Sequence, residues 1–236
     1  SLIVNGPAGG GTAWGGTAGI LRLTADNTFT GDLQLNAGSL EFTTVNDVGG
    51  GPSNLGQGTT IRLQGGTLRF VGGVDESTDR PITMTGGATL AANGAGGASI
   101  TYMGAISAAG NTLTLTGLPG SPGILSGGLI QTGTTADINI NSGNWTFTGS
   151  PLFVADDVVM TGGSTLTLAA PGILDSGSAI ADAALFVRGD STVRLAANDA
   201  IVGGTGDPTL PRASLPAGTP ARPEATPTSA SIDPPH

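Results

Sequence analysis

Six stretches of the chain repeat one plan: a short strand, a bend that contains Gly in every copy, and a second strand. These are residues 33–42, 61–70, 82–92, 138–147, 158–168 and 185–195. In the first copy, Leu33 and Leu35 flank a polar residue in the first strand, and Leu40 and Phe42 do the same in the second. Such period-two alternation puts the apolar residues of a strand on one face. The chain is therefore predicted to bury one face of every strand in a shared core.

The positions between these apolar residues are predicted to point outward in two rows. The first strands contribute Gln34, Arg62, Thr83, Asn139, Val159 and Phe186. The second strands contribute Glu41, Arg69, Ala91, Thr146, Thr167 and Arg194. If equivalent strands stack at the ~4.8 Å spacing of a sheet, each row runs along one face of the molecule.

The spacing of the copies indicates what they build. With a looser copy at Leu113 included, the copies begin at residues 33, 61, 82, 113, 138, 158 and 185. A four-stranded propeller blade needs about 40 to 45 residues, which is more than any of these intervals provides. One turn of a single-stranded parallel β-helix needs two strands, a bend and a short third side. We therefore expect an all-β parallel β-helix of seven to eight turns over residues 1–206, with loops at 46–58 and 117–123.

The two ends of the sequence differ from the repeats. Residues 207–236 hold eight of the fifteen prolines. Proline has no backbone N–H to donate to a ladder, so this segment is predicted to be an extended Pro-rich arm or linker. The chain starts on the strand-like Ser1–Val4 without an initiator Met or a signal peptide. We expect a processed mature form or a segment of a longer protein.

Composition excludes several classes of function. The chain has no Cys, which removes disulfides, thiol nucleophiles and Cys-based zinc sites, and it has no Lys. Its net charge of -9 and pI near 4.2 argue against nucleic acid and anionic membrane as partners. Because no run of 18 apolar residues occurs, membrane insertion is not expected. The 42 glycines suit a fold with many tight bends.

Residues 19–42 carry two motifs, Asn27-Thr28-Phe29-Thr30-Gly31 and Asn36-Ala37-Gly38-Ser39-Leu40. With the strands around them, these motifs resemble the autotransporter-associated β-strand repeat of bacterial surface proteins. The later copies keep only the strand, Gly-containing bend and second strand. The resemblance implies a passenger-type parallel β-helix, right-handed, that is secreted or displayed on the bacterial cell surface.

Catalytic chemistry has few candidate residues. The single His is the terminal His236, and with neither Cys nor Lys the possible acids and bases are mainly carboxylates. Polysaccharide-degrading β-helix enzymes need convergent acids, and neither outward row gathers them. Asp75, Glu76 and Asp79 beside Arg80 could hold a cation, but a solvated corner loop is the favoured interpretation. We assign no catalytic, cofactor-binding or metal-binding residue and expect no cofactor.

Two residues break the polar character of the first outward row. Val159 and Phe186 are predicted to lie on adjacent turns as an exposed apolar pair. The ends of a solenoid also expose strand edges that can pair with another chain. We expect self-association through the solenoid ends, the Val159/Phe186 patch and the Pro-rich arm, with surface glycans as a further candidate partner.

The predicted function is therefore a non-enzymatic structural one. The chain would serve as a passenger stalk, an adhesin or a self-assembling fibre subunit at the bacterial cell surface or outside the cell. A glycan-binding β-helix module is the alternative, and a polysaccharide-degrading enzyme is the less favoured third reading.

Overall fold

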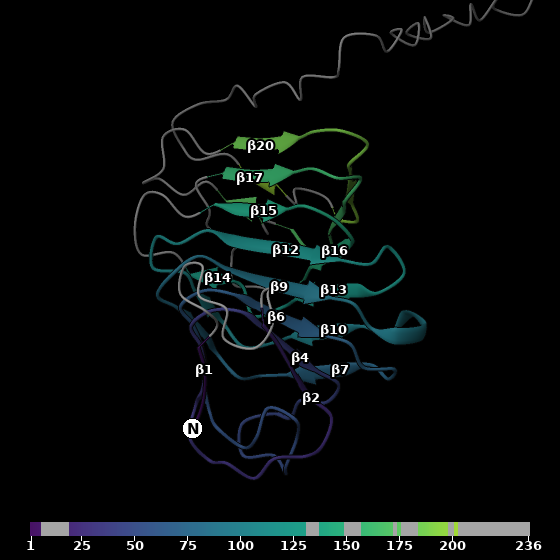
Figure 1. The fold of residues 1–236 in the computed structure, drawn as a ribbon. Helices are drawn as coiled ribbons and strands as arrows, with labels where there is room; N and C mark the ends of the chain where they lie inside the picture. Colours follow the sequence, from purple (N-terminus) through teal and green to yellow (C-terminus); the bar gives the residue numbers. More distant parts are fainter. Residues whose placement is uncertain are drawn as a thin grey trace, which may run out of the picture.

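The computed structural model describes residues 1–5, 19–130, 137–148, 157–171, 174–175, 184–197 and 201–202. Short strands from successive turns stack into a column, with β2 low and β20 high in Figure 1. Every pair of named strands is parallel. The prediction of an all-β parallel solenoid is confirmed. Within the described ranges, the one helical segment is a 3-10 turn, η1 (Ala95–Gly97).

Three sheets form the sides of the column. Sheet I contains β1 (Leu2–Val4), β3 (Leu33–Leu35), β5 (Ile61–Leu63), β8 (Ile82–Met84), β11 (Ile106–Ser107) and β14 (Leu129–Ile130). Sheet II contains β2 (Ile20–Leu23), β4 (Ser39–Phe42), β6 (Thr67–Phe70), β9 (Ala88–Ala92), β12 (Leu113–Gly117), β15 (Ile138–Ile140), β17 (Asp157–Met160) and β20 (Ala184–Val187). Sheet III contains β7 (Glu76–Thr78), β10 (Ile100–Tyr102), β13 (Pro122–Leu125), β16 (Asn144–Phe147), β18 (Thr165–Leu168) and β21 (Thr192–Leu195). Two further strands, β19 (Leu174–Asp175) and β22 (Ile201–Val202), pair with each other.

The described residues form about six turns, slightly fewer than the seven to eight expected. Sheet II has eight strands, but sheets I and III have six each, so the first and last layers lack a complete set of sides within the described part. The expected end of the β-helix at residue 206 and the Pro-rich arm at 207–236 lie outside the described residues.

The core is built from like side chains stacked along the column. The longest inward row crosses sheet II through Leu21, Leu40, Leu68, Leu90, Leu115, Ile140, Met160 and Val187. Its six middle members are fully buried. Next to this row, the rings of Phe42 and Phe70 lie 5.6 Å apart between centroids, tilted by 54°. Burying these apolar side chains, at about 25 cal/mol per Å², is the main stabilising contribution that the repeat pattern makes.

Glycine is required in the bend between sheets I and II. Gly38 and Gly66 occupy this bend in successive turns with φ of 83° and 75°. A Cβ on Gly66 would also lie 2.4 Å from the carbonyl oxygen of Gly38. The bend therefore needs Gly both for its positive φ and for close stacking of the turns.

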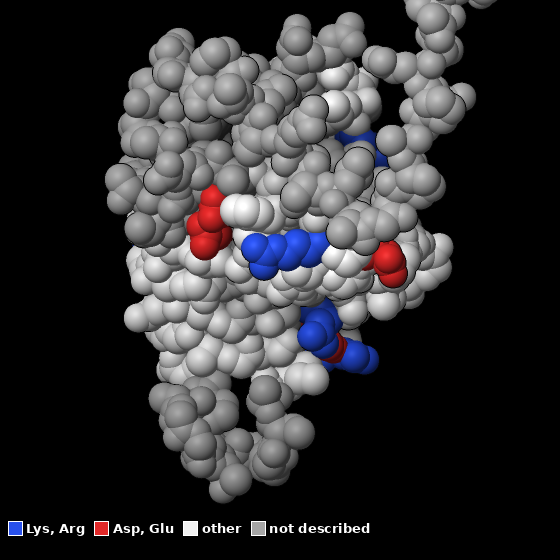
Figure 2. All heavy atoms as spheres, turned by 90° about the horizontal axis from the view of Figure 1, so that it is seen from above, with Lys and Arg blue, Asp and Glu red and all other residues white. Residues whose placement is uncertain are grey.

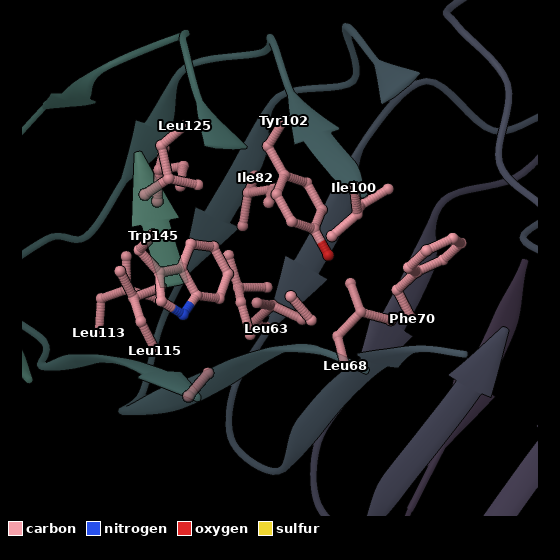
Figure 3. Packing of buried hydrophobic residues seen from close by; sticks show 14 of the residues in the cluster. Leu63, Leu68, Phe70, Ile82, Ile100, Tyr102, Leu113, Leu115, Leu125 and Trp145 are labelled. Carbon is pink, nitrogen blue, oxygen red and sulfur yellow. The ribbon is translucent and has the colours of Figure 1, made fainter. Parts of the chain in front are cut away.

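Among the described residues, two aromatic side chains of the core carry a buried polar atom that has no hydrogen-bond partner. Figure 3 shows Tyr102 and Trp145 reaching inward among Leu63, Leu68 and the other core side chains. The Tyr102 hydroxyl and the Trp145 indole N–H have no hydrogen-bond partner. Burial raises the pKa of Tyr102 far above its ordinary value of 10. Both rings are therefore held by packing rather than by hydrogen bonds.

The structure corrects the phase of the predicted repeat. In the copies that start at residues 33, 61 and 82, the first strands lie in sheet I. From Leu113 onward, the segments aligned with those strands lie in sheet II, one side further round the column. The step from 82 to 113 passes over β11, whose two residues carry too little pattern to be recognised. The buried inward positions were mostly predicted correctly, although Leu195 in the last copy, expected to be inward, is 61% exposed. Each predicted outward row mixes two sheets.

The largest described loop, residues 43–60, replaces a strand on one side of the column. Its buried Asn54 accepts hydrogen bonds through Oδ1 from the N–H and hydroxyl of Thr43, at 2.7 and 2.8 Å. Below it, Asn27 N–H donates to the Ser53 carbonyl at 2.8 Å, in the one isolated antiparallel bridge. Side-chain hydrogen bonds thus fasten the loop, which takes the place of a ladder strand between residues 27–29 and β7.

Candidate functional surface

An ion-pair ladder crosses the outward face of sheet II. Glu41 Oε2 lies 2.6 Å from Arg22, and Glu41 Oε1 lies 3.1 Å from Nη1 of Arg69. The strand register places the three residues side by side on β2, β4 and β6. Burial raises the pKa of Glu41, but hydrogen bonds and charge from the two arginines outweigh it, so the pKa lies below its usual value. Glu41 is thus held ionised as a structural anion.

Other outward side chains around this ladder are buried as well. Ser39 and Ala91, on the same face, are 8% and 1% exposed. The Ser39 hydroxyl and Nε of Arg69 have no hydrogen-bond partner. Both carboxylate oxygens of Glu41 contact an arginine. On the described strands of this ladder, no second acid lies beside Glu41. The arrangement therefore lacks the paired carboxylates that glycoside hydrolysis needs.

The acidic side chains at residues 75–79 each accept a hydrogen bond from a different backbone N–H instead of converging on one site. Asp75 Oδ1 accepts hydrogen bonds from the Ser99 N–H, at 2.7 Å, and from the Ser99 hydroxyl. These two bonds lower the pKa of Asp75. Glu76 Oε2 accepts from the Val45 N–H at 2.9 Å. Asp79 Oδ1 accepts from the Val48 N–H at 2.7 Å. Glu76 and Asp79 thereby bind the loop 43–60, whereas the sequence predicted only a solvated corner.

Arg80, beside this corner, is one of the largest fully buried side chains. Its Nη1 and Nη2 donate to the carbonyls of Leu55 and Gly56 at 3.0 and 2.5 Å. Burial lowers the pKa of Arg80, and the charges of Asp79 and Asp47 oppose that change. This role could not be predicted from the sequence, because the acceptors are backbone carbonyls that lie 24 and 25 residues earlier and leave no mark in the sequence pattern.

The described surface offers no cluster suited to a metal ion. Within the described ranges, no three Asp, Glu or His side chains gather closely enough to hold one. Among the described residues visible from above in Figure 2, most are uncharged and the basic and acidic groups are few. His236 lies outside the described residues. No helix in the described part of the chain is long and apolar enough to cross a membrane.

The predicted apolar patch is present in the structure. Val159 and Phe186 are register partners on β17 and β20, and Phe186 is 37% exposed. The Arg188 guanidinium lies 5.2 Å from the centre of the Phe186 ring, within the range of a cation–π contact. This contact was not predicted from the sequence, although Phe186 and Arg188 are residues i and i+2 and such residues of an extended segment share a face.

A polar row leads along sheet II to this patch. From β4 upward, the row contains Ser39, Thr67, Thr89, Thr114 and Asn139, followed by Val159 and Phe186. Its hydroxyl and amide groups lie at the strand spacing of ~4.8 Å. The row thus combines short polar side chains with an aromatic ring at one end.

Comparison with known proteins finds a partial similarity to one bacterial adhesin. The chain is 38% identical over 119 residues to the adhesin BmaC autotransporter of Brucella suis biovar 1 (strain 1330). That match covers 46% of this chain and 3% of the adhesin, so the chain corresponds to a small part of the adhesin's length. The sequence matches no protein-family model, and no solved structure matches. The similarity agrees with the autotransporter-like, surface-adhesin character predicted from residues 19–42.

Proposed function

We propose that the chain is a non-enzymatic β-solenoid segment of an exported bacterial surface protein, serving as part of an adhesin or its stalk. The parallel column carries this proposal, because it is a rigid, elongating architecture that adds one turn at a time. The similarity to an autotransporter adhesin supports a surface location. The pairing of Glu41 with two arginines, which gives this acid a structural role on sheet II, agrees with a non-enzymatic role.

Surface labelling tests the proposed location. Antibodies raised against the purified chain should label intact cells of the bacterium that encodes it, without permeabilisation. A periplasmic protein of the same bacterium serves as the control for cell integrity. Labelling that appears only after permeabilisation would contradict the proposed surface role.

Glycan binding is a second candidate function, favoured by the polar row that ends at Phe186. Sugars present hydroxyl groups to Thr and Asn side chains and an apolar ring face to an aromatic side chain. The purified chain should then bind immobilised glycans, and Phe186→Ala should weaken that binding by several-fold, as should Asn139→Ala. Leu118→Ala, which alters an exposed residue that is not a member of the row, is the control. Equal glycan binding by all three variants would contradict this function.

A further inference from the structure

At the lower end of the column, the three sheets differ in whether their terminal strand is covered. On sheet III, the loop 43–60 covers the free side of β7, where the Thr78 hydroxyl donates to the Asn46 carbonyl at 3.0 Å. Glu76 and Asp79 bind the same loop through its backbone N–H groups. On sheets I and II, β1 and β2 pair with another described strand on one side only. Among the described residues, two adjacent strand edges are therefore unpaired beside one that is covered.

At this end the inward rows are left partly exposed, and no other described strand covers them. Leu21 begins the long row of sheet II and is 38% exposed, whereas Leu40 in the next turn is 0% exposed. Leu2 and Val4 on β1 and Leu23 on β2 are likewise only partly buried. A further layer of apolar side chains would bury the surface that these residues leave in water.

The outward ladder is also incomplete at β2. Read upward from the edge, it places Arg22, Glu41 and Arg69 on successive strands. Glu41 is shared between both arginines, and the Arg22 side chain is 62% exposed. A carboxylate on a strand below β2 would face Arg22 at the distance of a cross-strand neighbour, where opposite charges attract.

We propose that the β1/β2 edge docks one further parallel β-solenoid turn whose strand beside β2 reads apolar, acidic, apolar. This chain contains that pattern in Leu40, Glu41 and Phe42, which already stack on β2 from above. In the docked turn the acidic residue pairs with Arg22, and its apolar neighbours cover Leu21 and Leu23. The inference depends on this edge and not on the adhesin role.

A second copy stacked in register is a poorer occupant. Among the described strands, Val187 is the last member of the row that Leu21 begins, and Arg188 follows Val187 as Arg22 follows Leu21. Stacking the upper end of one copy under the lower end of another would place Arg188 beside Arg22. Two like charges directly opposite each other destabilise a sheet.

A peptide that carries the proposed turn provides the test. The probe is LQLNAGSLEF, the sequence of residues 33–42, blocked at both ends and labelled with a fluorophore. It supplies one strand for β1 and one for β2, as β3 and β4 do on the other side. A second probe, LQLNAGSLRF, reverses the charge. In anisotropy titrations, the parent chain should bind the Glu probe several-fold more tightly than the Arg probe.

Substitutions in the chain decide whether Arg22 is responsible. Arg22→Gln should abolish the preference between the probes, and Arg22→Glu should invert it. Arg62→Gln is the matched control, because Arg62 is an exposed, ion-paired arginine on β5 that does not lie at the edge. Thermal unfolding of each variant checks that the column still forms.

Three results would overturn the proposal. One is no binding of either probe by the parent chain at the highest soluble concentration. Another is a probe preference that the Arg22 substitutions leave unchanged. The third is self-association of the parent that Arg22→Glu strengthens in light scattering, since that result makes a second copy, with Arg188 at its upper end, the occupant of the edge.

Discussion

Gly123 lies directly against the indole ring of Trp145. The two residues are register partners on β13 and β16, and a Cβ on Gly123 would come within 2.5 Å of the ring. Trp145 is 1% exposed, so it cannot move out into solvent. The inward row of sheet III thus accommodates its largest side chain by having no side chain at Gly123, on the strand below Trp145.

This relationship predicts strong coupling between the two positions. Gly123→Ala should overpack the core and cost about 1 to 3 kcal/mol of unfolding free energy. Trp145→Ala should cost about 3 to 5 kcal/mol through the cavity it leaves. The double variant should lose less than the sum of the two, because the added methyl group then enters that cavity. Urea unfolding of all four proteins measures the coupling, and strict additivity would show that the two residues do not touch.

Phe70 tests the stacking of the core rows. Phe70→Ala removes a fully buried ring that packs against Phe42 and should reduce the free energy of unfolding by about 3 to 5 kcal/mol. Val74→Ala is the control, since Val74 is 72% exposed and its loss should change stability by less than about 0.5 kcal/mol. Denaturant midpoints of the two variants give the comparison. Equal midpoints would mean that the row assignment is wrong.

Glu41 should make stability depend on pH in a defined direction. Its pKa in the folded chain lies below the ordinary value of 4.5, so its ion pairs stabilise the fold above that pH. The stabilisation is lost as the pH falls through the lowered pKa, because the protonated acid binds Arg22 and Arg69 less well. At neutral pH, Glu41→Gln should cost about 1 to 3 kcal/mol. Urea unfolding at neutral and acid pH should show this difference shrinking in acid, and a constant difference would contradict the assignment.

Arg80 should be more important for stability than an exposed arginine. Arg80→Met removes the donors to the Leu55 and Gly56 carbonyls and should cost at least about 2 kcal/mol. Arg62→Met breaks an exposed ion pair with Asp32 and should cost at most about 1 kcal/mol. Thermal and urea unfolding compare the two. If Arg62→Met is as destabilising as Arg80→Met, the loop 43–60 does not depend on Arg80.

Phe186 tests the predicted self-association of the apolar patch. The parent chain should form larger species as its concentration rises, and Phe186→Glu should reduce them because a carboxylate cannot be buried against Val159 of another copy. Leu118→Glu introduces the same charge at an exposed apolar residue outside the patch and should leave association unchanged. Size-exclusion chromatography with light scattering measures both. A parent chain that stays monomeric, or two variants that behave alike, would rule out this role of the patch.

The sequence predicted the inward residues well and their sheet assignment poorly. Leu33, Phe42, Ile138 and Phe147 are all buried as expected, because period-two alternation depends only on the strand itself. Strands of sheets I and II carry the same alternation, so no local signal says on which side of the column a strand lies. The two-residue strand β11 therefore went unrecognised, and the rows after it moved by one side.

The contacts on the surface and around the loop 43–60 likewise divide into one that could be predicted from the sequence and others that could not. The Val159/Phe186 pair could be predicted because both residues belong to one row of strands that had been aligned correctly. Arg22 and Glu41, by contrast, are 19 residues apart and meet only through strand stacking. The burial of Arg80 could not be predicted, since it depends on the path of an irregular loop.

The stacked ladder also determines how the column would respond to tension. The hydrogen bonds between turns run along the column axis, so a pull on its two ends loads the turns in series. Each turn contacts only the turns above and below it, and it can peel away while its neighbours stay folded. A tether built in this way would lengthen stepwise under flow, one turn at a time, and limit the force that reaches whatever is attached at either end.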